Sequence, residues 1–158
     1  MRRQRGGGRQ TVGLIVVEIP AAATHDLRRR ILRDGRFDVD LTFPEDEMGG
    51  SFHLGVQEGD AIVAVASFSP SPTDLRPGVE TYQLRGMAVE EGLQGTGVGR
   101  MLLEAAADRM RAAGVEAAWA YARDTALGFY EKLGWKVIGD GFHHGWRNMP
   151  HHFVVFDL

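Results

Sequence analysis

A glycine-rich segment that joins a strand-like run to a long amphipathic helix restricts the fold of this chain more than any other feature. Residues 82–89 have the composition of a strand and continue directly into the segment EEGLQGTGVGR. Over residues 98–113 apolar side chains recur at helical spacing, and Gly114 supplies the C-terminal stop. The helix therefore begins inside the loop, and its first amide groups have no partner within the helix. This arrangement predicts a site for an anion such as pyrophosphate, because the positive end of the helix dipole faces the loop.

The same glycines are also compatible with a purely structural role. A tight turn that packs a helix onto a sheet needs glycine as well, so the segment alone does not establish a ligand site. Two nucleotide-binding motifs fit poorly. The run Gly95-Thr96-Gly97-Val98-Gly99 lacks the G-x-G-x-x-G spacing of a dinucleotide fold, and no Gly-Lys-Ser/Thr follows it as a P-loop requires.

Strand-like and helix-like segments alternate along the rest of the chain. Composition and turn residues predict strands at residues 11–19, 51–57, 61–70, 115–122, 135–139 and 152–158. Helical spacing predicts helices over HDLRRRILR and over residues 125–133. The two strands that flank Glu58-Gly59-Asp60 are predicted to form a hairpin. This order predicts an α+β (α/β-like) fold with a mixed sheet, and a parallel or splayed step where the long helix crosses between strands.

Length and composition favour a single domain. The chain has 158 residues, of which 44 % are hydrophobic, so it can bury one sizeable core without disulfides or metals. It contains no cysteine, which excludes thiol nucleophiles and thiolate metal sites and fits a reducing cytoplasm. The net charge of −3 gives no overall basic field for nucleic acid or an anionic membrane. We expect a disordered basic tail at residues 1–10, one domain at 11–158, a cytoplasmic location, and no targeting or membrane-spanning segment.

Two separate motifs resemble those of one enzyme superfamily. Gln94-Gly95-Thr96-Gly97-Val98-Gly99 matches the Q/R-x-x-G-x-G/A motif of the GCN5-related N-acetyltransferase (GNAT) superfamily, and a hydrophobic strand ending in Met87-Ala88-Val89 precedes it. Further on, ARDTALGFYEKLGW (residues 122–135) is similar to the superfamily's A-R-x-x-A-x-x-F-Y-E-K-L-G-F segment. The resemblance extends from about Val12 to the C-terminus. It implies a single acyl-CoA N-acyltransferase domain whose mostly antiparallel sheet of six or seven strands is splayed at the cofactor strand.

The resemblance also implies a cofactor site for acetyl-CoA. The backbone of the splayed strand would pair with the pantetheine arm, the loop amides would hold the pyrophosphate, and a strand amide at Met87 or Val89 would polarise the thioester carbonyl. Tyr130 occupies the superfamily's usual position for the acid that protonates the departing thiolate. Arg123 departs from the pattern, since many relatives have a cofactor-contacting asparagine there. The expected cofactor-binding residues are Met87, Ala88, Val89, Gln94, Gly95, Thr96, Gly97, Val98, Gly99, Arg100, Arg123 and Tyr130.

The group that deprotonates the amine is not determined by the sequence. Glu80 and Tyr82, at the start of the cofactor strand, and His53 on the hairpin are candidates, with Glu80 the first choice, and a chain of water molecules is an alternative. Histidines 143, 144, 151 and 152 contain imidazole, a common metal ligand, but adjacent histidines on a strand point to opposite faces. We therefore expect no metal site. The acidic run Glu45-Asp46-Glu47 either attracts a cationic amine or is simply solvated.

These observations lead to one functional hypothesis and one rival. The chain is expected to be an acetyl-CoA-dependent N-acetyltransferase that transfers the acetyl group directly, in a ternary complex, to a primary amine of a small molecule or peptide. The rival is a non-catalytic module that binds acyl-CoA as a sensor. Transfer of a longer acyl chain and formation of a homodimer both stay open, and neither nucleic acid nor a membrane is expected as a partner.

Overall fold

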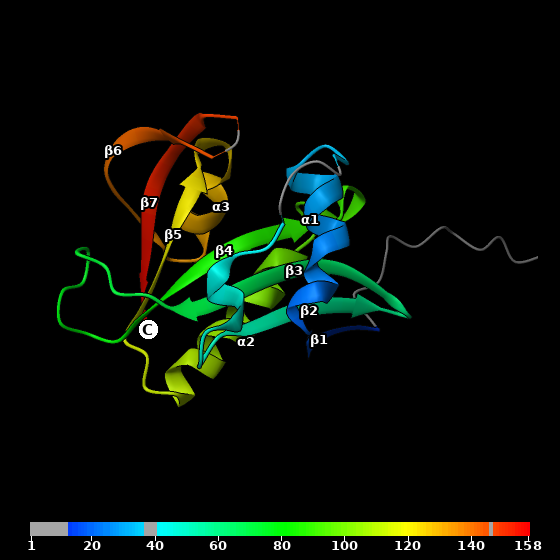
Figure 1. The fold of residues 1–158 in the computed structure, drawn as a ribbon, viewed down its shortest axis with the longest axis horizontal. Helices are drawn as coiled ribbons and strands as arrows, with labels where there is room; N and C mark the ends of the chain where they lie inside the picture. Colours follow the sequence, from blue (N-terminus) through cyan, green and yellow to red (C-terminus); the bar gives the residue numbers. More distant parts are fainter. Residues whose placement is uncertain (1–12, 37–40, 146) are drawn as a thin grey trace, which may run out of the picture.

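The computed structural model describes residues 13–36, 41–145 and 147–158, and these build one seven-stranded mixed sheet flanked by helices (Figure 1). The expected tail at residues 1–10 and the start of the expected first strand lie outside the described residues. Along the sheet the strand order is β1-β2-β3-β4-β5-β7-β6. The strands are β1 Leu14–Glu18, β2 Phe52–Glu58, β3 Ala61–Pro70, β4 Thr81–Val89, β5 Ala117–Arg123, β6 Lys136–His144 and β7 Met149–Asp157. The α-helices are α1 His25–Leu32, α2 Val98–Ala112 and α3 Leu127–Lys132, and the 3-10 turns are η1 Ala21–Thr24, η2 Pro44–Glu47, η3 Glu91–Leu93 and η4 Asp124–Ala126.

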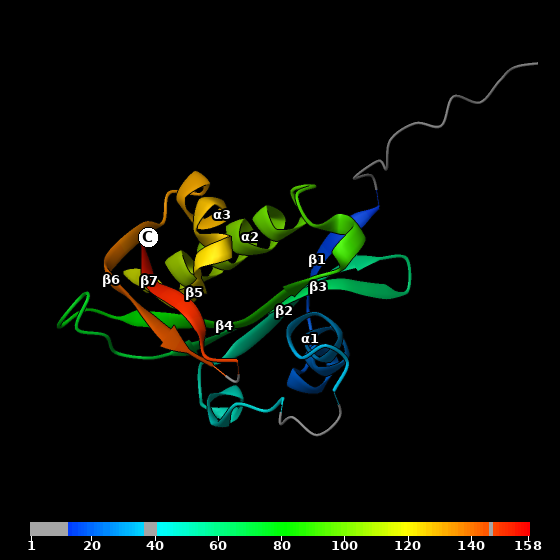
Figure 2. The ribbon, with the colours of Figure 1, turned by 90° about the horizontal axis from the view of Figure 1, so that it is seen from above.

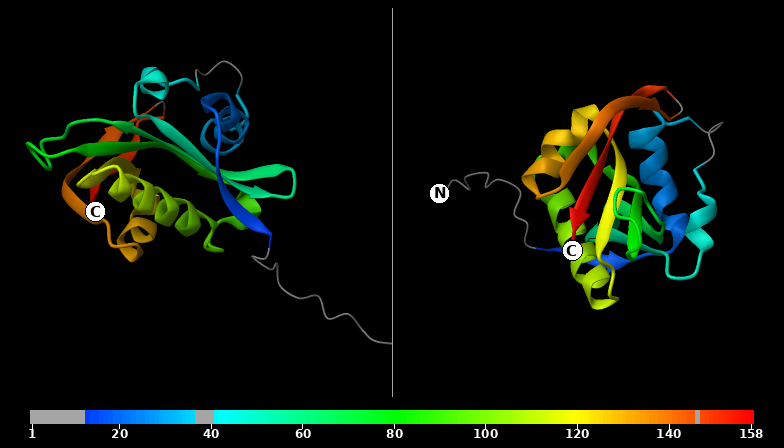
Figure 3. Two further views of the ribbon diagram at one scale, coloured as in Figure 1. Left: turned by 90° about the horizontal axis from the view of Figure 1, so that it is seen from below. Right: turned by 90° about the vertical axis from the view of Figure 1, so that its left-hand side faces the viewer.

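Helices cover both faces of the sheet. Figure 2 shows α1 and η2 on one face, and α2 with α3 on the other; Figure 3 shows the same layers from below. The main core lies between the sheet and α2, where Leu102 and Ala106 of the helix are fully buried. This is the helical stripe that the sequence predicts. A smaller core joins α1 to the sheet through Leu27, Val65 and Ala88.

The expected splayed step lies between β4 and β5. All other neighbouring strands are antiparallel, whereas β4 and β5 are parallel and pair only at Thr81–Ala117, Tyr82–Ala118 and Gln83–Trp119. Beyond Gln83 the two strands diverge (Figure 1). The mixed, mostly antiparallel and splayed sheet expected from the sequence is therefore confirmed.

The last two strands are longer than expected. The sequence predicts that one strand ends at Gly139 and the next begins at His152, whereas β6 continues to His144 and β7 begins at Met149. The cause is a bulge: the β6–β7 register shifts between Ile138 and Phe142, and Gly139 has a φ of +71°. Glycine tolerates this conformation, so a residue typical of a strand end stands inside a strand.

The α2 core predicts a large effect of truncating a single side chain. We expect Leu102→Ala to lower the free energy of unfolding by about 2–5 kcal/mol, because Leu102 is completely buried and its removal leaves a cavity. Asp108→Ala, on the exposed face of the same helix, should change it by no more than about 0.5 kcal/mol. Urea unfolding measures both values. A loss below about 1 kcal/mol for Leu102→Ala would show that α2 does not pack as described.

Candidate active site

A cavity of about 1160 Å³ occupies the space where β4 and β5 separate. Its walls come from the second half of β4, the end of β5, the loop before α2, the end of α1, η2, η4, one face of α3 and the turn between β6 and β7. Elements far apart in the sequence therefore meet around one space. Most of the residues that the sequence singled out lie in this wall: Met87, Ala88, Val89, Gln94, Gly95, Gly97, Gly99, Arg100, Arg123 and Tyr130.

The wall formed by β4 has an unusual backbone. Residues after Gln83 have no strand partner on the β5 side, so backbone groups on that side are available to a ligand. Opposite Ala66 the strand also bulges, since Arg85 pairs with Ser67 and Ala88 pairs with Val65, leaving two residues opposite one. Gly86 in this bulge has a φ of +59°, which favours glycine.

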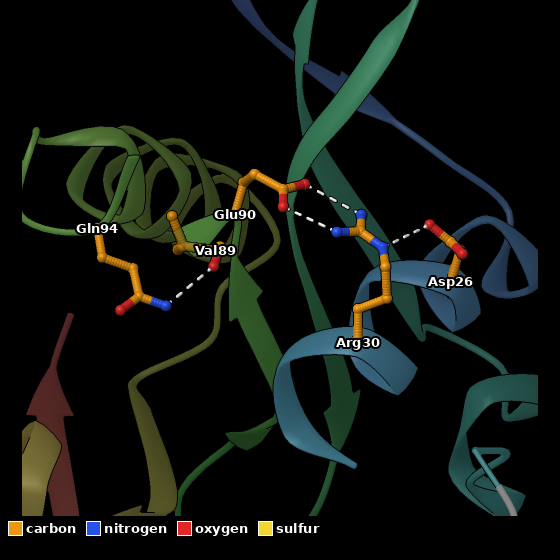
Figure 4. Close-up of polar contacts among 5 residues, drawn as sticks. All are labelled: Asp26, Arg30, Val89, Glu90 and Gln94. Atoms are coloured by element: carbon orange, nitrogen blue, oxygen red, sulfur yellow. Dashed lines mark hydrogen bonds and ion pairs between the residues drawn. The ribbon is translucent and has the colours of Figure 1, made fainter. Parts of the chain in front are cut away.

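Ion pairs and a side-chain amide fix the end of β4 (Figure 4). The Arg30 guanidinium of α1 donates to both carboxylate oxygens of Glu90, at 2.8 and 3.0 Å, and to Asp26 at 3.1 Å. The hydrogen bonds from Arg30 lower the pKa of Glu90, so this carboxylate stays ionised. On the opposite side of the strand end, Gln94 Nε2 donates to the carbonyl oxygen of Val89 at 3.1 Å. Gln94, expected to contact cofactor, thus also ties the loop to the strand.

The loop before α2 leaves the start of the helix open. Gly95 and the N-cap residue Gly97 have φ values of +78° and +92°. Among the described residues no side chain caps the helix, and its first turn contains no acidic residue. The amides of the first turn, at Val98, Gly99 and Arg100, therefore have no acceptor within the helix. This geometry suits a phosphate oxygen, and the anion site expected from the sequence stays a prediction.

Two residues of the expected loop set do not line the cavity. The Val98 side chain is buried in the main core. The Thr96 amide and hydroxyl both donate to the carbonyl oxygen of Leu93, at 3.2 and 2.5 Å, which closes the turn. Only the backbone of Val98 is available at the helix start, and Thr96 acts on the shape of the loop.

Tyr130 of α3 lies in the cavity wall and is only 6 % exposed. Its ring packs edge-on against Phe129 and Trp135, so it also forms part of the core. Burial raises the pKa of the Tyr130 phenol, since the charged form is poorly solvated there. The hydroxyl therefore stays protonated well above neutral pH, as a proton donor must.

Arg123 ends β5 and lines the cavity. Burial is the main reason why the pKa of Arg33 is lowered, and the charge of Arg123 lowers it further. The two guanidinium groups thus lie close enough to repel.

None of the three expected bases lies in the cavity wall. Glu80 precedes β4 in the loop at the end where β4 and β5 are still paired, and its backbone amide bonds to Glu116. The Tyr82 hydroxyl donates to the Gly50 carbonyl at 3.0 Å. The His53 ring is buried beneath η2 and hydrogen-bonded to Ser67. Glu80 and Tyr82 lie where β4 is still beside β5, because the two strands separate only after Gln83, whereas His53 lies on β2.

Three different proton acceptors do lie in the cavity wall: Glu45, His144 and His151. Glu45 lies 3.4 Å from Arg85, so its charge is paired rather than presented as an open acidic patch. Partial burial, with a smaller contribution from His151, lowers the pKa of His144, which is therefore neutral at pH 7. The sequence showed these histidines only as a cluster, and the β6–β7 pairing places His144 and His151 on the cavity side.

The described ranges contain neither a metal cluster nor a membrane-spanning helix. Over residues 13–36, 41–145 and 147–158, no group of three or more histidine, cysteine, aspartate or glutamate side chains could hold a metal ion. In the same part of the chain, no helix is both long enough and apolar enough to cross a membrane. His152 instead bonds to Asp124 at 2.6 Å.

Sequence comparison identifies related proteins. A model of the Acetyltransferase (GNAT) family matches residues 21–135. A protein of Bacillus subtilis (strain 168), described as uncharacterized N-acetyltransferase YitI, is 39 % identical over 129 residues, which cover 82 % of this chain and 87 % of that protein. The family model spans both motifs that carried the resemblance.

Solved structures share the fold. The IAA acetyltransferase from Bacillus cereus ATCC 14579 has a TM-score of 0.69 at 17 % identity, over 92 % of this chain and 99 % of that one. An aminoglycoside 6'-N-acetyltransferase complexed with coenzyme A has a TM-score of 0.72 at 17 % identity, over 90 % and 96 % of the two chains. The expected acyl-CoA N-acyltransferase fold is confirmed by these similarities.

The open helix start predicts the effect of a charge in the loop. We expect Gly97→Glu to weaken acetyl-CoA binding about 100-fold or more, because charge-assisted bonds to phosphate are worth about 1.5–3 kcal/mol each. Isothermal titration calorimetry measures the affinity. Gly92→Glu is the matched control: it adds the same charge in η3, where no atom lies within 4 Å of a new Cβ and φ is not positive.

Backbone strain must be separated from charge in this test, because Gly97 has a φ of +92°. Gly97→Ala introduces the strain alone and should cost about 1–2 kcal/mol of stability. If Gly97→Glu is folded and binds acetyl-CoA as tightly as Gly92→Glu, the loop does not hold the cofactor phosphates.

Proposed function

Because the chain belongs to the GNAT acetyltransferase family, we propose that it transfers the acetyl group of acetyl-CoA directly to a primary amine, in a ternary complex. One observation carries this proposal: the unpaired half of β4 and the uncapped start of α2 line the same cavity. An extended strand edge suits an amide-containing arm, and a helix start suits a pyrophosphate. Acetyl-CoA contains an amide-containing arm joined to a pyrophosphate, and it supplies an activated acetyl thioester.

The residues of this chain have distinct roles in the proposed reaction. Backbone groups of Met87, Ala88 and Val89 hold the arm of the cofactor, and the amides at the start of α2 hold its phosphates. A free amide at Met87 or Val89 donates to the thioester carbonyl oxygen, which becomes negative as the amine attacks. Arg100, which lines the cavity beside the helix start, adds a positive charge there.

Tyr130 is proposed as the acid that protonates the thiolate of coenzyme A. It lies in the cavity wall on α3, and its burial keeps the phenol protonated until it is needed. Another group of the cavity wall removes the proton from the amine. The candidates in the wall are Glu45, His144 and His151. Glu80 is not included in the proposed catalytic set, since it lies outside the cavity.

Release of free coenzyme A thiol tests the proposed activity directly. The protein is incubated with acetyl-CoA and a panel of amines: polyamines, aminoglycosides, amino acids and peptides with a free amino terminus. We expect amine-dependent thiol release with at least one class. Tight binding of acetyl-CoA without release on any amine would favour the non-catalytic sensor instead.

The role of Tyr130 predicts a selective loss of turnover. Tyr130→Phe should lower kcat by about 100- to 10,000-fold, the usual contribution of a general acid, while acetyl-CoA affinity changes less than about threefold. Tyr121→Phe is the matched control, because Tyr121 also lines the cavity but lies on β5. An unchanged kcat together with a lower melting temperature would make Tyr130 a packing residue.

The raised pKa of Tyr130 predicts the shape of the alkaline pH profile. A phenol is catalytically competent below its pKa, and burial moves this pKa above the ordinary value of about 10. Activity that depends on Tyr130 should therefore persist up to about pH 10. Measurement of kcat/KM from about pH 6 to about pH 10 checks this, and a fall centred below about pH 9 that disappears in Tyr130→Phe would contradict it.

A further inference from the structure

Arg28 of α1 is a buried cation without an ionic partner among the described residues. It is only 2 % exposed, and no carboxylate in the described part of the chain lies within ion-pair distance of its guanidinium. Burial lowers the pKa of Arg28 to about 10, against a smaller opposing effect of Asp46 and a minor lowering by Arg33. The side chain is therefore still charged at neutral pH. An unpaired buried ion is costly to desolvate, and pure packing would be served equally well by an apolar residue.

The bonds of this guanidinium all go to the bulged region of the sheet. Nε donates to the carbonyl oxygen of Gly86 at 2.9 Å, and Nη2 donates to Ser67 Oγ and, at 3.4 Å, to the carbonyl oxygen of Arg85. The Phe43 ring, a part of the cavity wall, lies 5.2 Å from the guanidinium carbon. A Cβ atom on Gly86 would overlap the guanidinium, so Arg28 fills the place of the missing side chain.

A relay of hydrogen bonds orients the guanidinium. Ser67 Oγ accepts from Nη2 of Arg28 and is also hydrogen-bonded to Nδ1 of His53, at 2.5 Å. Nε2 of the same His53 ring lies 3.4 Å from the carbonyl oxygen of Asp46. These hydrogen bonds connect Arg28 to β2, β3 and η2, and they hold its guanidinium against the bulge.

Arg28 contacts the carbonyl oxygen of the Gly86–Met87 peptide group, and the amide N–H of the same peptide group points away from Arg28. The carbonyl of Gly86 and the amide N–H of Met87 belong to one planar trans peptide and point in opposite directions. A cation bonded to the oxygen draws electron density along this peptide and makes its N–H a stronger donor. Gly86 and Met87 both line the cavity.

We propose that Arg28 is a positioning residue that holds the β4 bulge and polarises the Gly86–Met87 peptide, which strengthens the Met87 amide as a donor to the thioester carbonyl. This inference rests on the proposed function, and it selects Met87 over Val89 as the donor. It also explains why a charged residue rather than an apolar one occupies this buried position. The contribution is greatest in the transition state, because the carbonyl oxygen gains negative charge there.

The carbonyl stretching frequency of bound acetyl-CoA tests the proposal. The full-length protein is mixed with acetyl-CoA carrying ¹³C at the thioester carbonyl, without an amine, and infrared difference spectra are recorded. We compare the wild type with Arg28→Gln, which removes the charge, and Arg28→Lys, which retains it. Arg76→Gln is the matched control, because Arg76 pairs with Asp157 and does not line the cavity.

The expected results separate polarisation from folding. Bound acetyl-CoA should absorb at a lower frequency than free acetyl-CoA in the wild type and in Arg76→Gln. The shift should shrink in Arg28→Gln and recover partly in Arg28→Lys. In Arg28→Gln we expect kcat to fall about tenfold. Loss of a whole oxyanion donor lowers kcat by roughly 100- to 1,000-fold, and Arg28→Gln only weakens the donor. Acetyl-CoA affinity should change less than about threefold.

Two results would overturn the proposal. One is a wild-type frequency equal to that of free acetyl-CoA, which needs no variant. The other is an undiminished shift in folded Arg28→Gln, whatever its kcat. Failure of the wild type to bind acetyl-CoA would instead contradict the proposed function, so the two hypotheses fail separately.

Discussion

The separation of β4 from β5 after three residue pairs is the constraint on which the rest of the site depends. In a continuous sheet the backbone groups of β4 would be hydrogen-bonded to β5, and no space for a ligand would exist between the two strands. The crossover through α2 makes β5 a parallel neighbour of β4, and the two strands pair at their first residues and diverge beyond Gln83. The cavity, the free strand edge and the open start of α2 all follow from this geometry.

Positive and hydrogen-bonding groups lie beside the unpaired half of β4 on both faces of the sheet. On one face, the start of α2 offers unpaired amides and the side chain of Arg100. On the other, α1 contributes Arg30 to the end of β4 and Arg28 to its bulge. The flanking helices thus hold the unpaired part of β4 in shape where a neighbouring strand would ordinarily do so.

The sequence predicted the parts of the site that depend on local patterns. The Gly95–Gly97 loop, the long helix after it and Tyr130 on the short helix all have local signatures, and the structure has each element where it was expected. The position of a candidate base relative to the cavity depends instead on long-range strand pairing. Which residues of β4 reach the splayed region depends on where its pairing with β5 stops, and nothing local distinguishes Glu80 from a residue further along. Arg28 was equally hidden, because three consecutive arginines in α1 have the same chemistry and only packing decides which is buried.

The overlap between the Arg28 guanidinium and the missing Cβ of Gly86 has a consequence for how this chain can change over evolutionary time. Positions 28 and 86 share one volume, although 58 residues separate them. A side chain at position 86 requires a smaller residue at 28, and that exchange would remove the buried charge. Position 28 can therefore change alone, but position 86 can gain a side chain only after position 28 has changed, so the order of the two exchanges is fixed.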